Sequence, residues 1–319
     1  MKLFQLKRLF TFILFTGLIL FSCTKPEPKW EILTMGFSEN FHDILPIDKN
    51  NIIAYSYGTG LIVKSEDLGL TWKEVFKTDS IYFEQVAFPT PKVGFICGNT
   101  NRILKTNDGG NTWAEILIDS IPDTAPVYGM KFLNKEVGFI SVINRVQGVF
   151  ETEIYQTKNS GISWKKINTL SEMILNLEYV DNELWASGNN VVLKNIDKKN
   201  WQTVYKDTTK QVGQIRDFIH KGEQLIMSSF NGFIIRKNGS TFSKEKITPN
   251  RLRSIVRVND HKLIVAGDND KEEGNIFESN DNGISWNLID EKFNDIHRLK
   301  VANGIVWGIG KKDEIIKFH

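Results

Sequence analysis

The chain has 319 residues, and a typical domain holds about 100–200, so its length allows two or three domains or one large repeat fold. Hydrophobic residues make up 41% and charged residues 24% of the sequence, which excludes disorder as the main state. The 40 basic residues barely outnumber the 38 acidic ones, which excludes the basic excess of nucleic-acid-binding proteins, and two cysteines exclude a disulfide-stapled scaffold.

Residues 1–22 are predicted to be a lipoprotein signal peptide. The segment opens with three basic residues, Lys2, Lys7 and Arg8. Leu9–Phe21 then forms an apolar run of 13 residues, which is short against the ~20 that a spanning helix needs. The run ends in Leu-Phe-Ser-Cys at residues 20–23, which resembles the lipobox of bacterial lipoproteins. That resemblance implies cleavage before Cys23 and its lipidation; an ordinary secretory peptide cut nearby is the alternative.

Residues 23–29 are expected to form a short lipidated tether, because Thr24–Lys29 contains two prolines and three charges. Removing residues 1–22 leaves 37 basic against 38 acidic residues, so lipid on Cys23 rather than charge would hold the protein to a membrane. The expected location is the bacterial cell envelope after export, with the outer membrane favoured over the inner one.

A motif of eight residues repeats along the rest of the chain. Its pattern is Ser/Thr-x-Asp/Asn-x-Gly-x-Ser/Thr-Trp, and we call it the turn motif. Four copies are complete: Ser65–Trp72, Thr106–Trp113, Thr157–Trp164 and Ser279–Trp286. Asn195–Trp201 and Lys237–Phe242 are degenerate copies, and Trp30 resembles the end of another. Successive copies are 42, 41, 51, 37, 41 and 44 residues apart, a period that fits one four-stranded propeller blade.

The turn motif resembles the Asp-box, or BNR, repeat of sialidases, sortilin-type receptors and photosystem II assembly-factor-like propellers. Its Asp or Asn and Ser or Thr side chains are expected to bond backbone N–H groups in a tight turn. Its Gly supplies a positive φ, and its Trp begins the next strand. We therefore interpret the motif as a folding device, and its Asp residues are not candidate catalytic acids.

Each repeat is predicted to form strands A, B and C, the turn motif, and strand D. In the second repeat these strands are Tyr82–Phe88, Val93–Gly98, Ile103–Thr106 and Trp113–Ile118. Seven motif positions predict an all-β, seven-bladed β-propeller of four-stranded antiparallel blades that occupies residues 30–319. After Trp286 too few residues remain for another full repeat. The N-terminal strand is therefore expected to close the last blade by joining the C-terminal three strands.

Aligning the seven A strands gives a candidate site. Their first and fourth columns are apolar and predict inter-blade core. The second column is His42, Glu84, Tyr128, Leu175, Arg216, Arg253 and His297. Propeller symmetry would bring these side chains to one axial pocket, electropositive beside Arg216 and Arg253, which could bind an anion or polar peptide. Alternatively, the side chains of the ring satisfy one another, with Glu84 and the arginines paired across solvent in the channel. If it is a site, replacing both arginines with Ala should abolish binding without lowering Tm.

Two loops are expected on the same face as the axial ring. The 51-residue spacing places an insertion near Asn144–Glu151, where Arg145 and Phe150 form a candidate contact pair, or else a plain extended hairpin. The loop Asp268–Glu273 is acidic but lacks the spacing of a calcium loop, and we interpret it as solvated.

The preferred function is a non-catalytic, lipid-anchored propeller that binds an envelope protein, peptide or glycan. The alternative is a glycoside hydrolase of sialidase-like architecture, in which Glu84 would act with Asp43 or Asp217. The resemblance to sialidases would require an Arg triad and a Phe/Tyr-Arg-Ile-Pro motif; the ring column has two arginines and the sequence lacks that motif.

The five histidines show no metal-ligand spacing, so neither a metal nor a cofactor is expected, and no catalytic residue is assigned. Cys97 lies in an apolar run and is expected to be buried.

Overall fold

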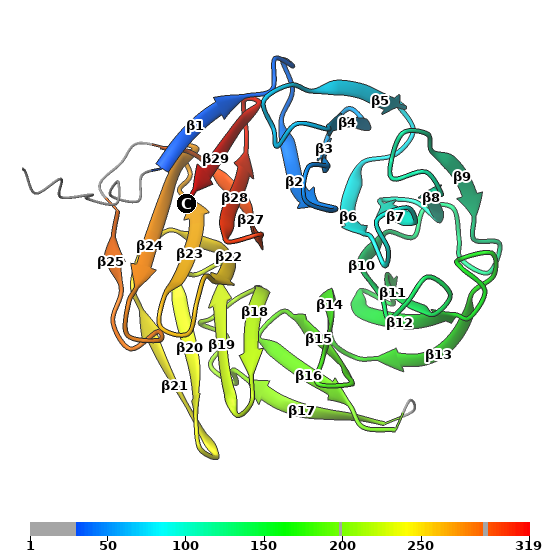
Figure 1. Ribbon diagram of the computed structural model, residues 1–319. Coiled ribbons are helices and arrows are strands. Elements are labelled where there is room, and N and C mark those ends of the chain that lie inside the picture. Colours follow the sequence, from blue (N-terminus) through cyan, green and yellow to red (C-terminus); the bar gives the residue numbers. More distant parts are fainter. Residues whose placement is uncertain (1–29, 198–199, 290–292) are drawn as a thin grey trace, which may run out of the picture.

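The computed structural model describes residues 30–319 except 198–199 and 290–292. In this part of the chain the regular elements are all strands, and they form seven antiparallel sheets around a central axis (Figure 1). The prediction of a seven-bladed β-propeller is confirmed. The predicted signal peptide (1–22) and tether (23–29) lie outside the described residues. None of the described residues belongs to a helix long and apolar enough to cross a membrane.

The blades share one strand order from the axis outward. The A strands are β2 (Phe41–Pro46), β6 (Phe83–Ala87), β10 (Val127–Phe132), β14 (Ile174–Val180), β18 (Ile215–Lys221), β22 (Arg251–Arg257) and β27 (Ile296–Ala302). The B strands are β3 (Ile52–Ser56), β7 (Gly94–Gly98), β11 (Gly138–Val146), β15 (Glu183–Gly188), β19 (Gln224–Ser229), β23 (Leu263–Asp268) and β28 (Ile305–Gly310). The C strands are β4 (Leu61–Ser65), β8 (Arg102–Thr106), β12 (Val149–Thr157), β16 (Val191–Asn195), β20 (Phe233–Asn238), β24 (Glu273–Ser279) and β29 (Glu314–Phe318). The D strands are β5 (Lys73–Lys77), β9 (Ala114–Leu117), β13 (Lys165–Leu170), β17 (Trp201–Lys206), β21 (Thr241–Lys246), β25 (Asn287–Leu288) and β1 (Trp30–Thr34).

The two ends of the chain close the ring, as predicted. Strand β1 pairs antiparallel with β29, with Trp30 opposite Phe318, and completes the sheet β1-β29-β28-β27 (Figure 1). Closure pairs a strand edge that would otherwise be open. Blade six differs from the others, because β25 is only two residues long and β26 (Phe293–Asn294) also pairs with β24.

The core lies between neighbouring blades. Every residue in the first and fourth columns of the A strands is buried, which confirms the expectation for these positions. Trp185 and Trp307, on the B strands, are also buried, as is the Cys97 thiol, whose pKa is raised by burial. Burying these apolar side chains on both sides of each sheet provides the main favourable free energy of the fold.

The turn motif forms the expected hydrogen bonds. In blade two, Thr106 Oγ1 accepts the Gly110 N–H over 2.9 Å and donates to Asp108 Oδ1 over 2.7 Å. Asp108 Oδ1 also accepts the N–H groups of Asn111 and Thr112, each over 3.0 Å. Gly110 has φ +82°, where a side chain would be strained. The side chains of the motif thus satisfy the backbone of a tight turn.

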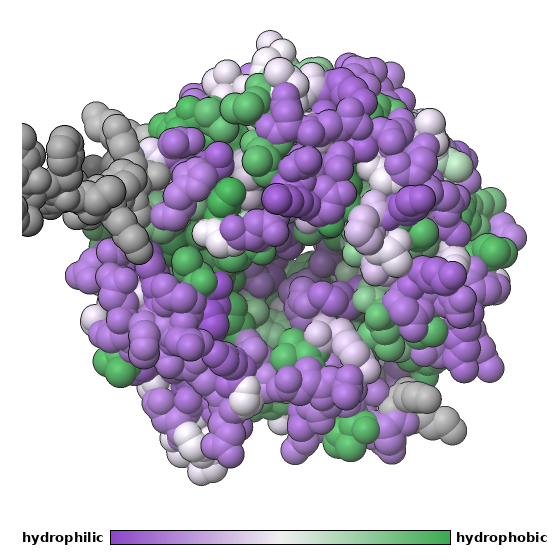
Figure 2. All heavy atoms as spheres, in the orientation of Figure 1, coloured by the Kyte–Doolittle hydropathy of each residue, from purple (hydrophilic) through white to green (hydrophobic). Residues whose placement is uncertain are grey.

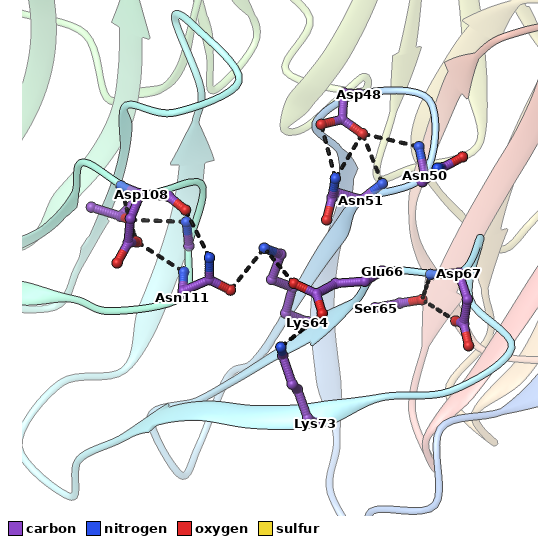
Figure 3. Close-up of polar contacts among 12 residues, drawn as sticks. Asp48, Asn50, Asn51, Lys64, Ser65, Glu66, Asp67, Lys73, Asp108 and Asn111 are labelled. Carbon is purple, nitrogen blue, oxygen red and sulfur yellow. Dashed lines mark hydrogen bonds and ion pairs between the residues drawn. The ribbon is translucent and has the colours of Figure 1, made fainter.

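Each complete turn motif also packs on the preceding blade. A Cβ atom at Gly110 would lie 2.7 Å from Ile53 Cδ1 of blade one, so only glycine fits there without a shift. Lys64, at the end of the C strand of blade one, donates from Nζ to Asn111 Oδ1 over 2.9 Å (Figure 3). The motif therefore joins two blades as well as two strands.

Candidate functional site

A β-bulge recurs on every A strand. The pairing with strand B shifts at the second-column position in all seven blades, for example between Phe41 and Asp43 of blade one. A bulge leaves the extra residue without a ladder partner and redirects its side chain. The bulged residues are His42, Glu84, Tyr128, Leu175, Arg216, Arg253 and His297.

The bulges open onto one pocket of about 520 Å³ at the axis. Six second-column residues line it: His42, Glu84, Tyr128, Arg216, Arg253 and His297. The seventh, Leu175, is buried and is not on the pocket wall. Figure 2 shows a hollow at the centre of the ring, with hydrophilic side chains around it. The structure thus brings together all six residues that the sequence singles out.

Two aromatic residues complete the wall. Tyr57 and Phe230 each follow the last residue of strand B and line the pocket from the loop between strands B and C. They are not among the predicted residues, although their shared place in the repeat is a signal in the sequence. The guanidinium groups of Arg216 and Arg253 lie 5.2 and 4.9 Å from the centre of the Phe230 ring, within cation–π range.

Asp268 neutralises part of the expected positive charge. Arg253 donates from Nε and Nη2 to Asp268 Oδ2 over 3.0 and 2.8 Å, and Arg251 Nε donates to Oδ1 over 2.6 Å. Asp268 is only 1% exposed, so the interpretation of the Asp268–Glu273 loop as solvated is wrong at this residue. It holds for Asp270, whose side chain is 99% exposed. Strand β23 places Asp268 behind the pocket wall beside the arginines, and their charges compensate its burial.

Arg216 differs from Arg253 because it forms no ion pair with any residue in the described part of the chain. Its Nε donates to the neutral amide oxygen of Gln214 over 3.1 Å. Burial, followed by repulsion from Arg298, lowers the pKa of Arg216 to about 10, so the group is still charged at neutral pH. Glu84 raises the pKa of Arg216 by its charge but lies outside ion-pair distance, so this partly buried guanidinium is suited to receive an anionic group from a ligand.

The other titratable groups of the pocket carry less charge. Burial lowers the pKa of His42 well below its ordinary value, and the nearby His297 lowers it further, so this imidazole is neutral at pH 7. Burial raises the pKa of Glu84, whose Oε2 lies 3.8 Å from His42 Nε2. His297 Nε2 lies 3.1 Å from Asp295 Oδ2. Arg251 and Lys311 also line the pocket, but they pair with Asp268 and Glu272, so Arg216 is the cation of this pocket that has no ion-pair partner among the described residues.

A third column of polar residues lies beside the second and was not predicted as a unit. Three of its side chains accept N–H groups from the free inner edge of the next A strand. Gln85 Oε1 accepts Met130 N–H over 2.7 Å, and Asp217 Oδ2 accepts Ile255 N–H over 3.1 Å. Ser254 Oγ accepts the N–H of Leu299 over 3.1 Å. These bonds link blades around the axis and satisfy donors that no strand pairs.

The third column also accounts for the carboxylates considered for a glycosidase. Asp43 accepts the Ile44 N–H over 2.8 Å and, like Asp217, is not on the pocket wall. Burial lowers the pKa of Arg298, but the carboxylates of Asp43 and Asp217 outweigh it and leave this pKa raised. Among these candidates only Glu84 lines the pocket, so the pairs expected from the sequence, Glu84 with Asp43 or with Asp217, do not both face it.

The insertion in blade three is an extended hairpin, the second of the two expected alternatives. Strands β11 and β12 are nine residues long, and Arg145 lies directly opposite Phe150 near their tip. The guanidinium lies 5.6 Å from the ring centre, so the two residues contact each other. They line a second hollow of about 730 Å³ that shares Tyr128 with the axial pocket. The hairpin therefore extends the candidate site outward.

One cluster in the described residues has the composition of a metal site. Ligand atoms of Asp268, Asp295 and His297 lie within 4.8 Å of one another. Arg251 and Arg253 already occupy both oxygens of Asp268, and their charges disfavour a further cation. The cluster is better described as the counter-charge of the arginines.

Comparisons with known proteins agree with this architecture. The sequence model of the family described as photosynthesis system II assembly factor YCF48 matches residues 23–298. No curated protein matches the chain in sequence. A solved structure of YCF48 bound to D1 peptide has a TM-score of 0.72 at 19% identity and covers 91% of this chain and 96% of its own. YCF48 from Cyanidioschyzon merolae has a TM-score of 0.71 at 17% identity, covering 91% and 98%.

An enzyme shares the same fold. Virginiamycin B lyase from Staphylococcus aureus has a TM-score of 0.72 at 17% identity and covers 92% of this chain and 99% of its own. At such identities the likeness concerns the fold alone, and the function has to be argued from the site.

Proposed function

The chain belongs to the photosynthesis system II assembly factor YCF48 family, and from this premise we propose that it is a non-catalytic propeller whose axial pocket binds a peptide segment of another protein. The observation that carries the proposal is Arg216, a partly buried, charged guanidinium with no ion-pair partner among the described residues, on the wall of a pocket of about 520 Å³. A carboxylate, from an acidic side chain or a C-terminus, is the complementary group.

The shape of the site favours a polypeptide over a small anion. Tyr128 lies on the wall of both the axial pocket and the hollow of about 730 Å³ beneath the blade-three hairpin. A ligand held at Arg216 could therefore continue past Tyr128 toward Arg145 and Phe150. Aromatic and Arg side chains of this kind commonly anchor interfaces. The structure of YCF48 bound to D1 peptide supports the proposal, since it records a peptide on a propeller of this family.

The proposed location is the bacterial cell envelope, where lipid on Cys23 would anchor the exported protein, with the outer membrane favoured. The support is the sequence alone: the apolar run Leu9–Phe21 followed by a lipobox-like tetrapeptide. The partner would then be an envelope protein or peptide, with an envelope glycan as another possible ligand. Metabolic labelling with a palmitate analogue tests this, because Cys23→Ser should abolish labelling; equal labelling of the variant would contradict the anchor.

Peptide binding can be tested with a matched pair of arginine variants. We expect a library of acidic peptides to yield binders whose affinity falls at least tenfold with Arg216→Met. The control is Arg102→Met, since Arg102 begins strand β8 of blade two with a half-exposed side chain that pairs with Glu115. The same peptides with C-terminal amides would distinguish a terminal carboxylate from a side-chain one. Equal binding to both variants, or turnover of sialosides lost on Glu84→Gln, would overturn the proposal.

A further inference from the structure

The contact between the turn motif of one blade and the B strand of the preceding blade shows how a turn can bind between two blades. It indicates where a second binding site lies. In four places the glycine of a motif packs on the apolar residue that lies three positions before the end of the B strand in the preceding blade. A Cβ added to these glycines would lie between 2.7 and 3.2 Å from that residue. The pairs are Gly69 on Trp307, Gly110 on Ile53, Gly161 on Phe95 and Gly283 on Ile226.

Trp185 holds the same B-strand position in blade four, but blade five lacks the motif whose glycine would pack on it. Strands β20 and β21 are joined directly, with Asn238 opposite Thr241, so only Gly239 and Ser240 form the turn. A hollow of about 460 Å³ lies there instead, between blades four and five. We call it the blade-four notch; Trp185, Lys194, His220 and Ser240 are among its lining residues.

A lysine in the notch is also left without its usual partner. Lys64 and Lys105, each next to last in its C strand, donate from Nζ to the turn motif of the following blade. The acceptors are Asn111 Oδ1 and the Ser160 carbonyl, each over 2.9 Å (the first is drawn in Figure 3). Lys194 occupies the same place in blade four and pairs with Glu183 of its own blade instead, over 3.2 Å.

Trp185 adds a donor. The residue is 4% exposed, its ring centre lies 4.9 Å from that of His220, and its indole Nε1 has no hydrogen-bond acceptor. A buried donor without an acceptor costs free energy, so a ligand that brings an acceptor would be favoured. We call the B-strand residue on which a motif glycine packs the glycine seat. The blade-four notch thus has both a glycine seat, Trp185, and the lysine that bonds a turn motif elsewhere in this protein.

We propose that the blade-four notch binds a glycine-containing turn of a partner protein, which inserts as the following blade's motif does at the other seats. The turn would set its glycine against Trp185 and present a carbonyl or amide oxygen to Lys194. The notch is lined by the turns between strands C and D and between A and B, so it lies on the face opposite the axial pocket. The site is therefore independent of the proposed peptide binding there.

The first test uses a cyclised peptide that copies residues 105–114, the turn motif of blade two, and follows the Trp185 indole N–H resonance by NMR. We expect a saturable shift, assigned by its loss in Trp185→Phe. A peptide with Val in place of Gly110 should bind at least tenfold more weakly, because its side chain meets the seat. Ser240→Arg should block the notch, whereas the neighbouring Thr241→Arg should not. Equal binding of both peptides, or equal binding to both arginine variants, would overturn the proposal.

A second test places the turn in the same chain as the notch, so that binding does not have to offset the entropy lost when a free peptide binds. Replacing Lys237–Phe242 with Ser279–Trp286 would place a complete turn motif beside the notch within the same chain. We expect Tm to rise and the Trp185 resonance to shift, and the same graft with Val in place of Gly283 to do neither. If neither the graft nor the peptide moves the Trp185 resonance, the notch is not a receptor for such turns.

Discussion

Arg253 directs both Nε and Nη2 at the same carboxylate oxygen of Asp268, over 3.0 and 2.8 Å. The Asp268 side chain is 2% exposed, whereas that of Arg253 is 21% exposed. The main role of Arg253 is therefore to neutralise a buried carboxylate, and not to bind a ligand. Arg216, in the neighbouring blade, has no carboxylate to neutralise among the described residues. The two arginines of the second column therefore have different roles.

This difference predicts that the two arginines contribute unequally to stability. Arg253→Met should lower the free energy of unfolding by about 1–3 kcal/mol, because it leaves Asp268 with Arg251 alone; removing a partner from a fully buried pair costs ~3–5 kcal/mol. Arg216→Met should change it by less than about 0.5 kcal/mol, since no carboxylate loses a partner. Urea unfolding measures both. The expectation that both arginines can be replaced without lowering Tm is thus revised for Arg253, and equal losses in the two variants would contradict this account.

The third-column bonds predict that Asp217 is a structural residue. Its carboxylate accepts the N–H groups of Phe218 and Ile255 over 2.9 and 3.1 Å and the Ser254 hydroxyl over 2.7 Å. Asp217→Ala should destabilise the fold by about 2–4 kcal/mol, because buried donors then lack acceptors. Asp260→Ala is the matched control, since that side chain is 76% exposed and its loss should leave the free energy of unfolding nearly unchanged. Similar losses in both variants would mean that the inter-blade bonds contribute little.

The fold could be predicted because its signals are local and repeated. The strands of blade two differ by at most one residue at each end from their predicted bounds, since an apolar run and a turn motif bound each of them. Closure by Trp30–Thr34 followed from counting strands after Trp286. The turn motif is fully specified by side chains within eight residues of one another. Such interactions do not depend on the rest of the chain.

The site could be predicted only in part, because its charges are balanced by residues from other strands. The second column identified six pocket residues, but nothing in the A strands indicates that Asp268, at the end of a B strand, accepts Arg253. The neighbouring exposed Asp270 makes the whole loop look solvated in sequence. The seven bulges were also unexpected, since a bulge depends on the pairing between strands rather than on one strand's sequence.

Burial of His42 predicts that stability falls in mild acid. Its pKa in the folded state is lowered by burial and then by the charge of His297, well below the ordinary value of 6.5. As the pH falls below about 6.5, the unfolded chain binds a proton that the folded ring does not, so unfolding is favoured by up to ~1.4 kcal/mol per pH unit. His42→Phe should flatten this slope. Urea midpoints between about pH 5 and pH 7.5 measure it, and an unchanged slope in the variant would contradict the prediction.

The steric contribution of the glycine seat to stability can be measured by comparing two glycines that have similar backbone conformations. Gly110 has φ +82° and Gly148 has φ +86°, so alanine at either position is strained by the backbone. A Cβ at Gly110 would also meet Ile53 at 2.7 Å, whereas a Cβ at Gly148 has nothing within 4 Å. Gly110→Ala should therefore cost about 1–3 kcal/mol more than Gly148→Ala, the usual penalty for overpacking a core.

Urea unfolding of the two alanine variants gives this difference directly, because the backbone strain is common to both. Ile53→Val in the Gly110→Ala background should recover part of the loss, since it removes the atom that the new Cβ meets. If both alanine variants lose the same free energy, the seat imposes no steric demand for glycine. The blade-four notch would then have no reason to prefer a glycine-containing turn, whereas peptide binding in the axial pocket would be unaffected.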